Sequence, residues 1–336
     1  MNCVRTLPAT VDSPRAQRRF ITRMGQDGTA GLNVGFPTRE RGPRVGTSAV
    51  SVIMAARNAG RTVRAAVCSI LAQDYPDFEL VVVDDASDDA TSSILATLAE
   101  DRLHVMRADT RVGRSAARNR AIREARHGLI AVMDADDFSL PSRLSRSVGI
   151  LESEPELGGV GGQAAAMDGG KLRRFGAAPT DREVVNRALL AGRMPLVHPS
   201  LLIRREVIDA TGGYDETVTW CEDLELLSRA AKRFEFTSSP DVWLLYRKRR
   251  RDSWSQLWNT ERSRRAIADR LASRKPYTGK DTAATLAWSA RAWIGQRRQQ
   301  SAEVLNPTPE MRTAFDDCRA YDTLDAVASS TSIRAS

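Results

Sequence analysis

The chain has 336 residues and a formal net charge of +8, with 42% hydrophobic and 27% charged residues. These proportions are typical of a soluble globular protein and exclude a collagen, a coiled coil and a wholly disordered chain. No run of 18 apolar residues occurs, so no transmembrane helix is expected. Four cysteines without a CxxC pair and three histidines without paired spacing argue against a disulfide scaffold and a histidine-based zinc site.

The positive charge lies near the two ends of the chain. Residues 1–47 carry eight Arg and three acids, and residues 243–280 carry twelve Lys or Arg and three acids, which leaves a net charge of −6 for the rest. A nucleic-acid-binding protein usually carries its positive charge on its folded binding face, so no nucleic-acid partner is expected. Residues 1–47 lack a sustained apolar period and are expected to form a flexible basic arm.

From Ala49 onward, short apolar runs alternate with helical periods. Strands are expected over 50–54, 78–83, 103–106 and 129–133, with helices over 61–73, 90–99 and 115–126. Continuous apolar strands that alternate with helices are typical of a parallel sheet covered on both faces. The sequence therefore predicts an α/β fold, an α/β/α sandwich with a mostly parallel sheet.

Beyond residue 157 the pattern is looser. Thr180 and Glu183 form a capping-box pattern, which predicts the start of a helix. The other expected elements are a strand over 199–203, a short helix ended by Gly212, a helix opened by Glu222, and a strand over 242–246. A helical C-terminal extension is expected over 251–326, followed by a disordered tail over 327–336.

Two of the expected strands end in acidic clusters. Asp84 and Asp85 follow the second strand, and Asp134, Asp136 and Asp137 follow the fourth. Ligands of parallel sheets bind at the carboxyl ends of the strands, and a D-x-D pair can share Mg²⁺ or Mn²⁺ with a substrate phosphate. The sequence therefore predicts a site for a metal and a polar ligand. Each cluster, taken alone, is also compatible with a polar turn or a helix cap.

Three further features carry weaker signals. Residues 111–119 place a Gly turn and three Arg at an expected helix start, which favours anions; ordinary surface arginines are the alternative. Glu222 and Asp223 open a helix, where the helix dipole alone favours acids. His198 precedes a proline, which is more typical of a turn than of a metal ligand.

In their order along the chain, these segments resemble a family 2 glycosyltransferase with the GT-A fold. The resemblance covers residues 50–255. The segments that carry it are VSVIMAARN at 50–58, SILAQDYPDFEL at 69–80, DDASD at 84–88, GRSAARN at 113–119, DADD at 134–137, ED at 222–223 followed by Leu226 and Arg229, and YR at 246–247.

The resemblance implies roles for individual residues. Asp85 would hold the nucleoside, and Arg118 would approach the nucleotide. Asp134 and Asp136 would serve the nucleotide and a divalent cation, Mn²⁺ or Mg²⁺, with Asp136 the more direct ligand. Asp223 would be the general base. The nucleotide-sugar site as a whole would comprise Ala56, Asn58, Asp85, Arg118, Asp134 and Arg247.

The resemblance also implies a domain organisation and a reaction. Residues 48–250 would form the GT-A domain, with a nucleotide-sugar half at 48–150 and an acceptor half at 151–250. The implied reaction is a single inverting transfer of a sugar from a nucleotide-diphosphate sugar to the hydroxyl of a glycan, lipid-linked or small-molecule acceptor. It would serve cell-surface polysaccharide, glycolipid or secondary-metabolite glycan synthesis. No Gln-x-x-Arg-Trp motif follows Asp223, so a processive synthase is not expected.

Two alternatives stay open at this point. A nucleotidyltransferase of related fold would carry a Gly-rich basic loop after the first strand, which residues 55–61 match poorly. A catalytically inactive sugar-nucleotide-binding protein would be expected to have lost its acids. The enzyme is expected in the cytoplasm, and the basic stretch 247–280 indicates either a peripheral contact with an anionic membrane or a solvated surface.

Overall fold

The computed structural model describes residues 48–168, 170–175, 178–247, 261–264, 266–267 and 305–332, all within one compact unit of the chain, residues 36–336. The predicted arm over 1–47 lies outside the described residues. So does most of the basic stretch 247–280, together with the greater part of the extension between 251 and 304.

A nine-stranded sheet runs through this unit in the order β3-β2-β1-β4-β8-β6-β9-β5, and β7 pairs with β6. Its strands are β1 (Val50–Ala56), β2 (Phe78–Asp84), β3 (Leu103–Arg107), β4 (Leu129–Asp134), β5 (Phe138–Ser139), β6 (Leu157–Asp168), β7 (Lys171–Phe175), β8 (Leu202–Arg204) and β9 (Glu235–Arg247). Strands β1 to β4 pair in parallel, as predicted. Beyond β4 the sheet is mixed, because β8 runs antiparallel to both β4 and β6, while β9 runs parallel to β6 and antiparallel to β5.

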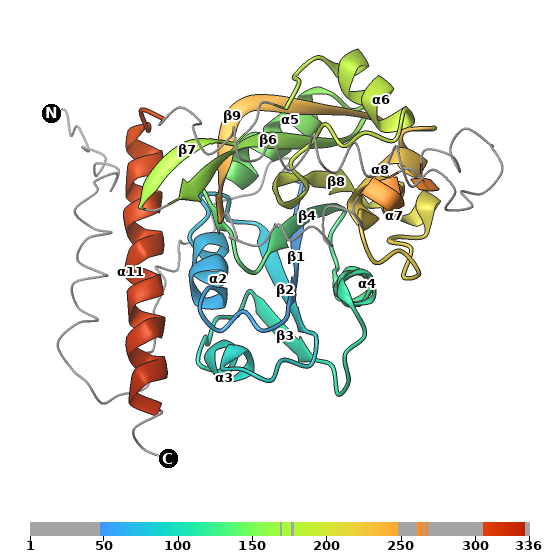
Figure 1. The fold of residues 1–336 in the computed structure, drawn as a ribbon. Coiled ribbons are helices and arrows are strands. Elements are labelled where there is room, and N and C mark those ends of the chain that lie inside the picture. Colours follow the sequence, from blue (N-terminus) through green and yellow to red (C-terminus); the bar gives the residue numbers. More distant parts are fainter. Residues whose placement is uncertain are drawn as a thin grey trace, which may run out of the picture. The chain divides into compact units, whose positions relative to one another are not determined.

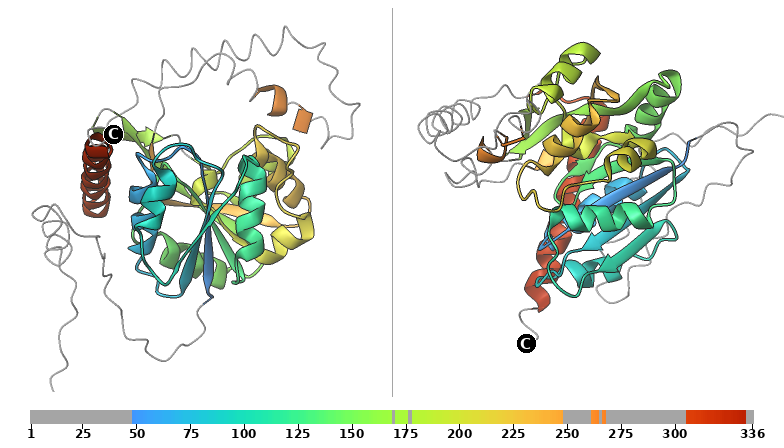
Figure 2. Two further views of the ribbon diagram at one scale, coloured as in Figure 1. Left: turned by 90° about the horizontal axis from the view of Figure 1, so that it is seen from below. Right: turned by 90° about the vertical axis from the view of Figure 1, so that its right-hand side faces the viewer.

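Helices cover both faces of the sheet (Figures 1 and 2). One face packs against α2 (Val63–Leu71), α3 (Thr91–Ala96) and α5 (Arg143–Ser153), and the other against α4 (Arg114–Glu124), α6 (Arg182–Leu190), α7 (Arg205–Thr211) and α8 (Glu222–Ala230). Strand β1 shows why its apolar run is continuous: Val52 and Met54 enter the first core, and Ile53 enters the second. Because successive side chains point to opposite faces, a strand buried on both sides cannot alternate with polar residues.

The second half of the chain departs from its predicted boundaries. Asp181, rather than Thr180, caps α6, since Asp181 has extended backbone and its side chain accepts a hydrogen bond from the Val184 N–H. The strand predicted over 199–203 is a 3-10 turn at His198–Ser200 followed by β8, because Pro199 lies in the first turn of a short helix. Strand β9 begins at Glu235 rather than at 242, because Pro240 and the polar residues before it hide the strand pattern.

A long C-terminal helix, α11 (Pro309–Ser332), lies beside α2 (Figure 1). Its buried side chains Met311, Ala314 and Cys318 share a third apolar cluster with strand β5. The helix continues through 327–332, which corrects the prediction of a disordered tail beginning at 327; the segment contains no Gly or Pro that would end it. No helix within the described ranges is long and apolar enough to cross a membrane.

Gly162 on β6 allows a tryptophan to fill the core beside strands β6 and β9. Trp243 on β9 is fully buried, and a Cβ atom added at Gly162 would overlap its ring. Because the ring is fully buried in a close-packed core, it has little room to move away.

Gly162→Ala is therefore expected to lower the free energy of unfolding by about 1–3 kcal/mol through overpacking. Gly149→Ala is the matched control. Gly149 is exposed in the interior of α5 with open space around it, so the same change there should raise stability by about 0.5–1 kcal/mol. Urea denaturation of both variants measures the difference. Equal changes in the free energy of unfolding at the two sites would show that the Trp243 ring can move to accept the added methyl group.

Candidate active site

The two predicted acid clusters meet at one edge of the sheet. In the parallel register, Ala56 lies opposite Asp84, and Ala55 lies opposite Asp134. Strand β1 therefore places the ends of β2 and β4 on its two sides. This is the arrangement that the apolar strand pattern implied, and it sets the base of the site.

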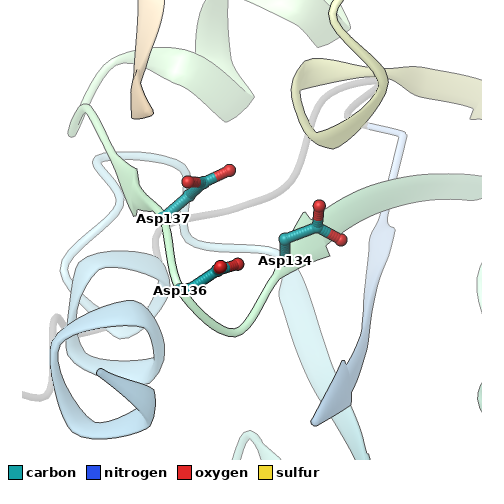
Figure 3. Close-up of side chains that lie close together, drawn as sticks. All are labelled: Asp134, Asp136 and Asp137. Atoms are coloured by element: carbon teal, nitrogen blue, oxygen red, sulfur yellow. The ribbon is translucent and has the colours of Figure 1, made fainter. Parts of the chain in front are cut away.

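Three carboxylates gather in the segment that follows β4. Oxygen atoms of Asp134, Asp136 and Asp137 lie within 4.8 Å of one another. Figure 3 shows the Asp136 side chain pointing toward Asp134, with Asp137 farther along the same turn. Burial, together with the neighbouring charges of Asp134 and Asp136, raises the pKa of Asp137 well above its usual range. The repulsion within this cluster would be relieved by a bound cation.

Asp137 provides a test of whether these residues suit a metal. One carboxylate oxygen, Oδ1, accepts a hydrogen bond of 2.9 Å from the Arg247 backbone N–H. The other, Oδ2, is buried without a hydrogen-bond partner. A buried oxygen that lacks a donor, beside two further carboxylates, is a ligand set that suits a hard divalent cation. Sequence reasoning assigned only Asp134 and Asp136, although Asp137 completes the same DADD motif.

A buried arginine connects the acid cluster to the second half of the chain. The Arg118 side chain on α4 is 2% exposed, and its guanidinium donates to Asp134 Oδ1 at 2.7 Å and to Glu222 Oε1 at 2.8 Å. Arg114, one turn earlier, also contacts Glu222, at 3.2 Å, but its side chain is 67% exposed. Arg118 thus joins the end of β4 to the first turn of α8.

Glu222 and Asp223 are neighbours in the sequence with opposite electrostatic environments. Burial alone would raise the pKa of Glu222, but the Arg118 and Arg114 guanidinium groups hold it below its usual range. The Asp223 Oδ1 accepts a 2.8 Å hydrogen bond from the Leu224 N–H. Burial, and then the charge of Glu222, raise the pKa of Asp223 to about 6. Asp223 can therefore exchange a proton near neutral pH.

A histidine and a tyrosine lie against Arg118, and sequence reasoning did not identify either as part of the site. His198 Nε2 lies 2.9 Å from the Tyr214 hydroxyl oxygen, and the Arg118 guanidinium carbon lies 5.5 Å from the centre of the Tyr214 ring. Burial, followed by the positive charge of Arg118, lowers the pKa of His198 to about 3. The imidazole is therefore neutral at pH 7, and it adds no charge to the site. No local sequence signal connects His198 with Tyr214.

Asp85 lies at the predicted edge, with both carboxylate oxygens engaged. It accepts hydrogen bonds from the Val112 N–H at 2.6 Å and from the Gly113 N–H at 3.1 Å, and it is 4% exposed. Gly113 has φ +94°, a conformation that other residues adopt rarely. In this structure Asp85 therefore holds the loop that starts α4.

The other predicted nucleotide-sugar residues also form links between strand ends. The buried Ala56 carbonyl accepts a hydrogen bond from the Asp85 N–H. Asn58 has a positive φ of 49° and accepts from the Asp88 N–H at 3.1 Å. Arg247 lies on the far side of the acid cluster, where its guanidinium donates to the Asp136 carbonyl and contacts Asp322 on α11. The structure thus brings Asp134, Asp136, Arg118 and the Glu222–Asp223 pair together, and it turns the Arg247 guanidinium toward α11.

Comparison with known proteins agrees with this architecture. Residues 51–212 match the family described as Glycosyl transferase family 2. The matched segment, residues 51–212, belongs to this family. Over 201 residues it is 35% identical to the succinoglycan biosynthesis protein ExoU of Rhizobium meliloti (strain 1021), a match that covers 54% of this chain and 56% of ExoU. The chain therefore spans little more than half the length of this relative.

Two solved structures share the fold of this chain. The S. aureus TarS fragment 1–349 in complex with UDP-GlcNAc matches with a TM-score of 0.53 and 17% identity, over 67% of this chain and 71% of that one. The mannosyltransferase PcManGT from Pyrobaculum calidifontis, in complex with GDP-Man and Mn²⁺, matches with a TM-score of 0.53 and 22% identity, over 84% and 86% of the two chains. These likenesses establish the GT-A fold.

Removal of the buried guanidinium is expected to destabilise the protein strongly. Arg118→Met keeps most of the side-chain length but leaves Asp134 and Glu222 without their shared cation. Breaking a buried ion pair costs about 3–5 kcal/mol, so urea denaturation at pH 7 should show a loss of that size. Arg114→Met is the control, since an exposed partner of Glu222 contributes about 1 kcal/mol or less. A similar small loss in both variants would mean that Arg118 is not a structural link.

Proposed function

We propose that the chain is an inverting glycosyltransferase that moves a sugar from a nucleotide-diphosphate sugar to an acceptor hydroxyl. The observation that carries this proposal is the Asp134–Arg118–Glu222 bridge, because it holds a carboxylate cluster suited to a metal diphosphate beside a carboxyl group, Asp223, whose pKa is about 6. An acid cluster for the leaving group and a separate base are the two elements that such a displacement needs.

The donor would bind at the edge where β1, β2 and β4 end. Asp134, Asp136 and Asp137 would hold a divalent cation, with the unpaired Oδ2 of Asp137 as a ligand that the sequence did not single out. The cation supplies positive charge that stabilises a leaving diphosphate. Ala56, Asn58 and Asp85 would border the nucleoside, with the carboxylate of Asp85 holding the Gly113 loop in the present structure.

Asp223 would act on the acceptor. A sugar hydroxyl is a weak nucleophile at neutral pH, and a carboxylate with a pKa near 6 is ionised at pH 7 yet basic enough to accept the proton as the hydroxyl attacks. The hydroxyl would attack the anomeric carbon on the face opposite the leaving group, so the configuration inverts in one displacement. Glu222 is less suited to this task, because Arg118 and Arg114 stabilise its ionised form.

The relatives support a nucleotide-sugar donor and a role in polysaccharide synthesis. ExoU is described as a succinoglycan biosynthesis protein, and the two structural neighbours were determined with UDP-GlcNAc and with GDP-Man and Mn²⁺. From these relatives we infer that this chain acts in polysaccharide synthesis and uses a glycan or lipid-linked acceptor. A turnover screen across UDP-, GDP- and dTDP-sugars with Mn²⁺ and Mg²⁺ tests it. Absence of both transfer and metal-dependent donor hydrolysis across this panel would favour an inactive sugar-nucleotide-binding protein.

The base assignment predicts a specific loss. Asp223→Asn should lower kcat about 10²–10⁴-fold, the usual contribution of general-base catalysis, while the dissociation constant of the donor nucleotide changes little. Steady-state transfer assays and nucleotide titration measure the two quantities separately. Near-normal transfer by the variant would place the base elsewhere.

The raised pKa of Asp223 also predicts the pH dependence. Only the ionised carboxylate accepts a proton, so kcat/KM for the acceptor should fall tenfold per pH unit below about pH 6 and level off above it. The same assay on Asp223→Asn should show a residual rate that does not fall below pH 6. A wild-type profile that is flat between pH 5 and 7 would contradict the assignment.

The metal assignment is tested at Asp136. Asp136→Asn keeps the shape of the side chain but removes the charge that a hard cation prefers. Transfer should fall at least about 100-fold, the upper part of the range for weakened metal sites, and excess EDTA should abolish transfer by the wild-type enzyme. Full activity in EDTA would rule out the metal role for Asp134, Asp136 and Asp137 together.

A further inference from the structure

We propose that Asp322, on the C-terminal helix α11, is a positioning residue for the metal site and acts through Arg247. The proposal rests on the proposed function, because it concerns the same carboxylate cluster. Both residues lie beyond the segment 51–212 that matches the family.

Arg247 fixes the acid cluster at two points. Its backbone N–H donates to Asp137 Oδ1 at 2.9 Å, and its Nε donates to the Asp136 carbonyl oxygen at 2.9 Å. One residue at the end of β9 therefore sets the orientation of the Asp137 carboxylate and the backbone position of Asp136. The second oxygen of Asp137 is left unpaired in the buried interior of the site.

Asp322 fixes Arg247 in turn. The two terminal guanidinium nitrogens of Arg247 contact the two carboxylate oxygens of Asp322, at 2.5 Å from Nη1 to Oδ2 and at 3.0 Å from Nη2 to Oδ1. Such a two-point pair restrains the plane of the guanidinium as well as its position. Because Nε belongs to the same plane, the pair also directs the hydrogen bond from Nε to Asp136. The side chains of Arg247 and Asp322 are 22% and 32% exposed, so water can replace the contact when the carboxylate is neutralised.

Helix α11 has other contacts that hold it in place without Asp322. Met311, Ala314 and Cys318 are buried in the cluster that contains Phe138 of β5. Near the start of the helix, Glu310 accepts hydrogen bonds from the backbone N–H and the hydroxyl of Ser142. A change at Asp322 should therefore loosen the acid cluster while leaving the helix docked.

The direct test is the affinity for Mn²⁺ alone, measured by electron paramagnetic resonance of free Mn²⁺ with the full-length chain. Asp322→Asn should weaken Mn²⁺ binding about 10- to 100-fold, the range expected when a residue that orients metal ligands is lost. Asp322→Glu should recover part of the affinity. In both variants the thermal midpoint should stay close to that of the wild type.

Two control variants separate positioning from general damage to the helix. Asp316 lies exposed on the same helix, and Asp316→Asn should leave the Mn²⁺ affinity unchanged. Glu310→Gln weakens a different polar anchor of α11, and this variant should have a lower thermal midpoint without weaker Mn²⁺ binding.

Equal Mn²⁺ affinities for Asp322→Asn and Asp316→Asn would overturn the positioning role while leaving the proposed function intact. A loss of Mn²⁺ affinity in Glu310→Gln as large as that in Asp322→Asn would also overturn the positioning role. Docking of the helix, rather than the contact with Arg247, would then control the metal site. Failure of the wild-type chain to bind Mn²⁺ would overturn both this inference and the metal assignment in the proposed function.

Discussion

The buried guanidinium of Arg118 is the interaction on which the site depends. A fully buried cation costs several kcal/mol in desolvation unless charged partners compensate it, and here Asp134 and Glu222 supply two carboxylates within 2.8 Å. Asp134 ends strand β4, and Glu222 lies in the first turn of helix α8, so the two partners are far apart in the sequence. The charge requirement of one side chain therefore brings the acid cluster and the Glu222–Asp223 pair to the same place.

Helix α4 reinforces this connection through the next residue. The Asn119 amide donates to the Tyr214 carbonyl at 2.8 Å and accepts from the Tyr214 N–H at 2.9 Å, so it holds the chain that leads toward α8. At the start of the same helix, Asp85 holds the Gly113 loop through two backbone N–H groups. Helix α4 and the loop before it thus connect Asp85, at the end of β2, with the chain that leads toward α8.

The sequence predicted those parts of the structure that follow from local pattern. Continuous apolar strands required a parallel sheet, and a parallel sheet required Asp85 and Asp134 to share an edge. The unpaired oxygen of Asp137 and the contact from Arg247 to Asp322 had no such signal, because each depends on a contact between residues more than 70 positions apart. His198 was interpreted from its proline neighbour alone, whereas its environment is set by Tyr214 and Arg118.

The contrast between Glu222 and Asp223 shows how the fold divides two neighbouring carboxyl groups. Successive helical residues point in directions about 100° apart, so only Glu222 meets the Arg118 guanidinium, and its pKa falls below the usual range. Asp223 is left with burial and with the negative charge of that same neighbour, and its pKa rises to about 6. Glu222 therefore serves the structure twice, as the partner that allows Arg118 to be buried and as the charge that makes Asp223 more basic.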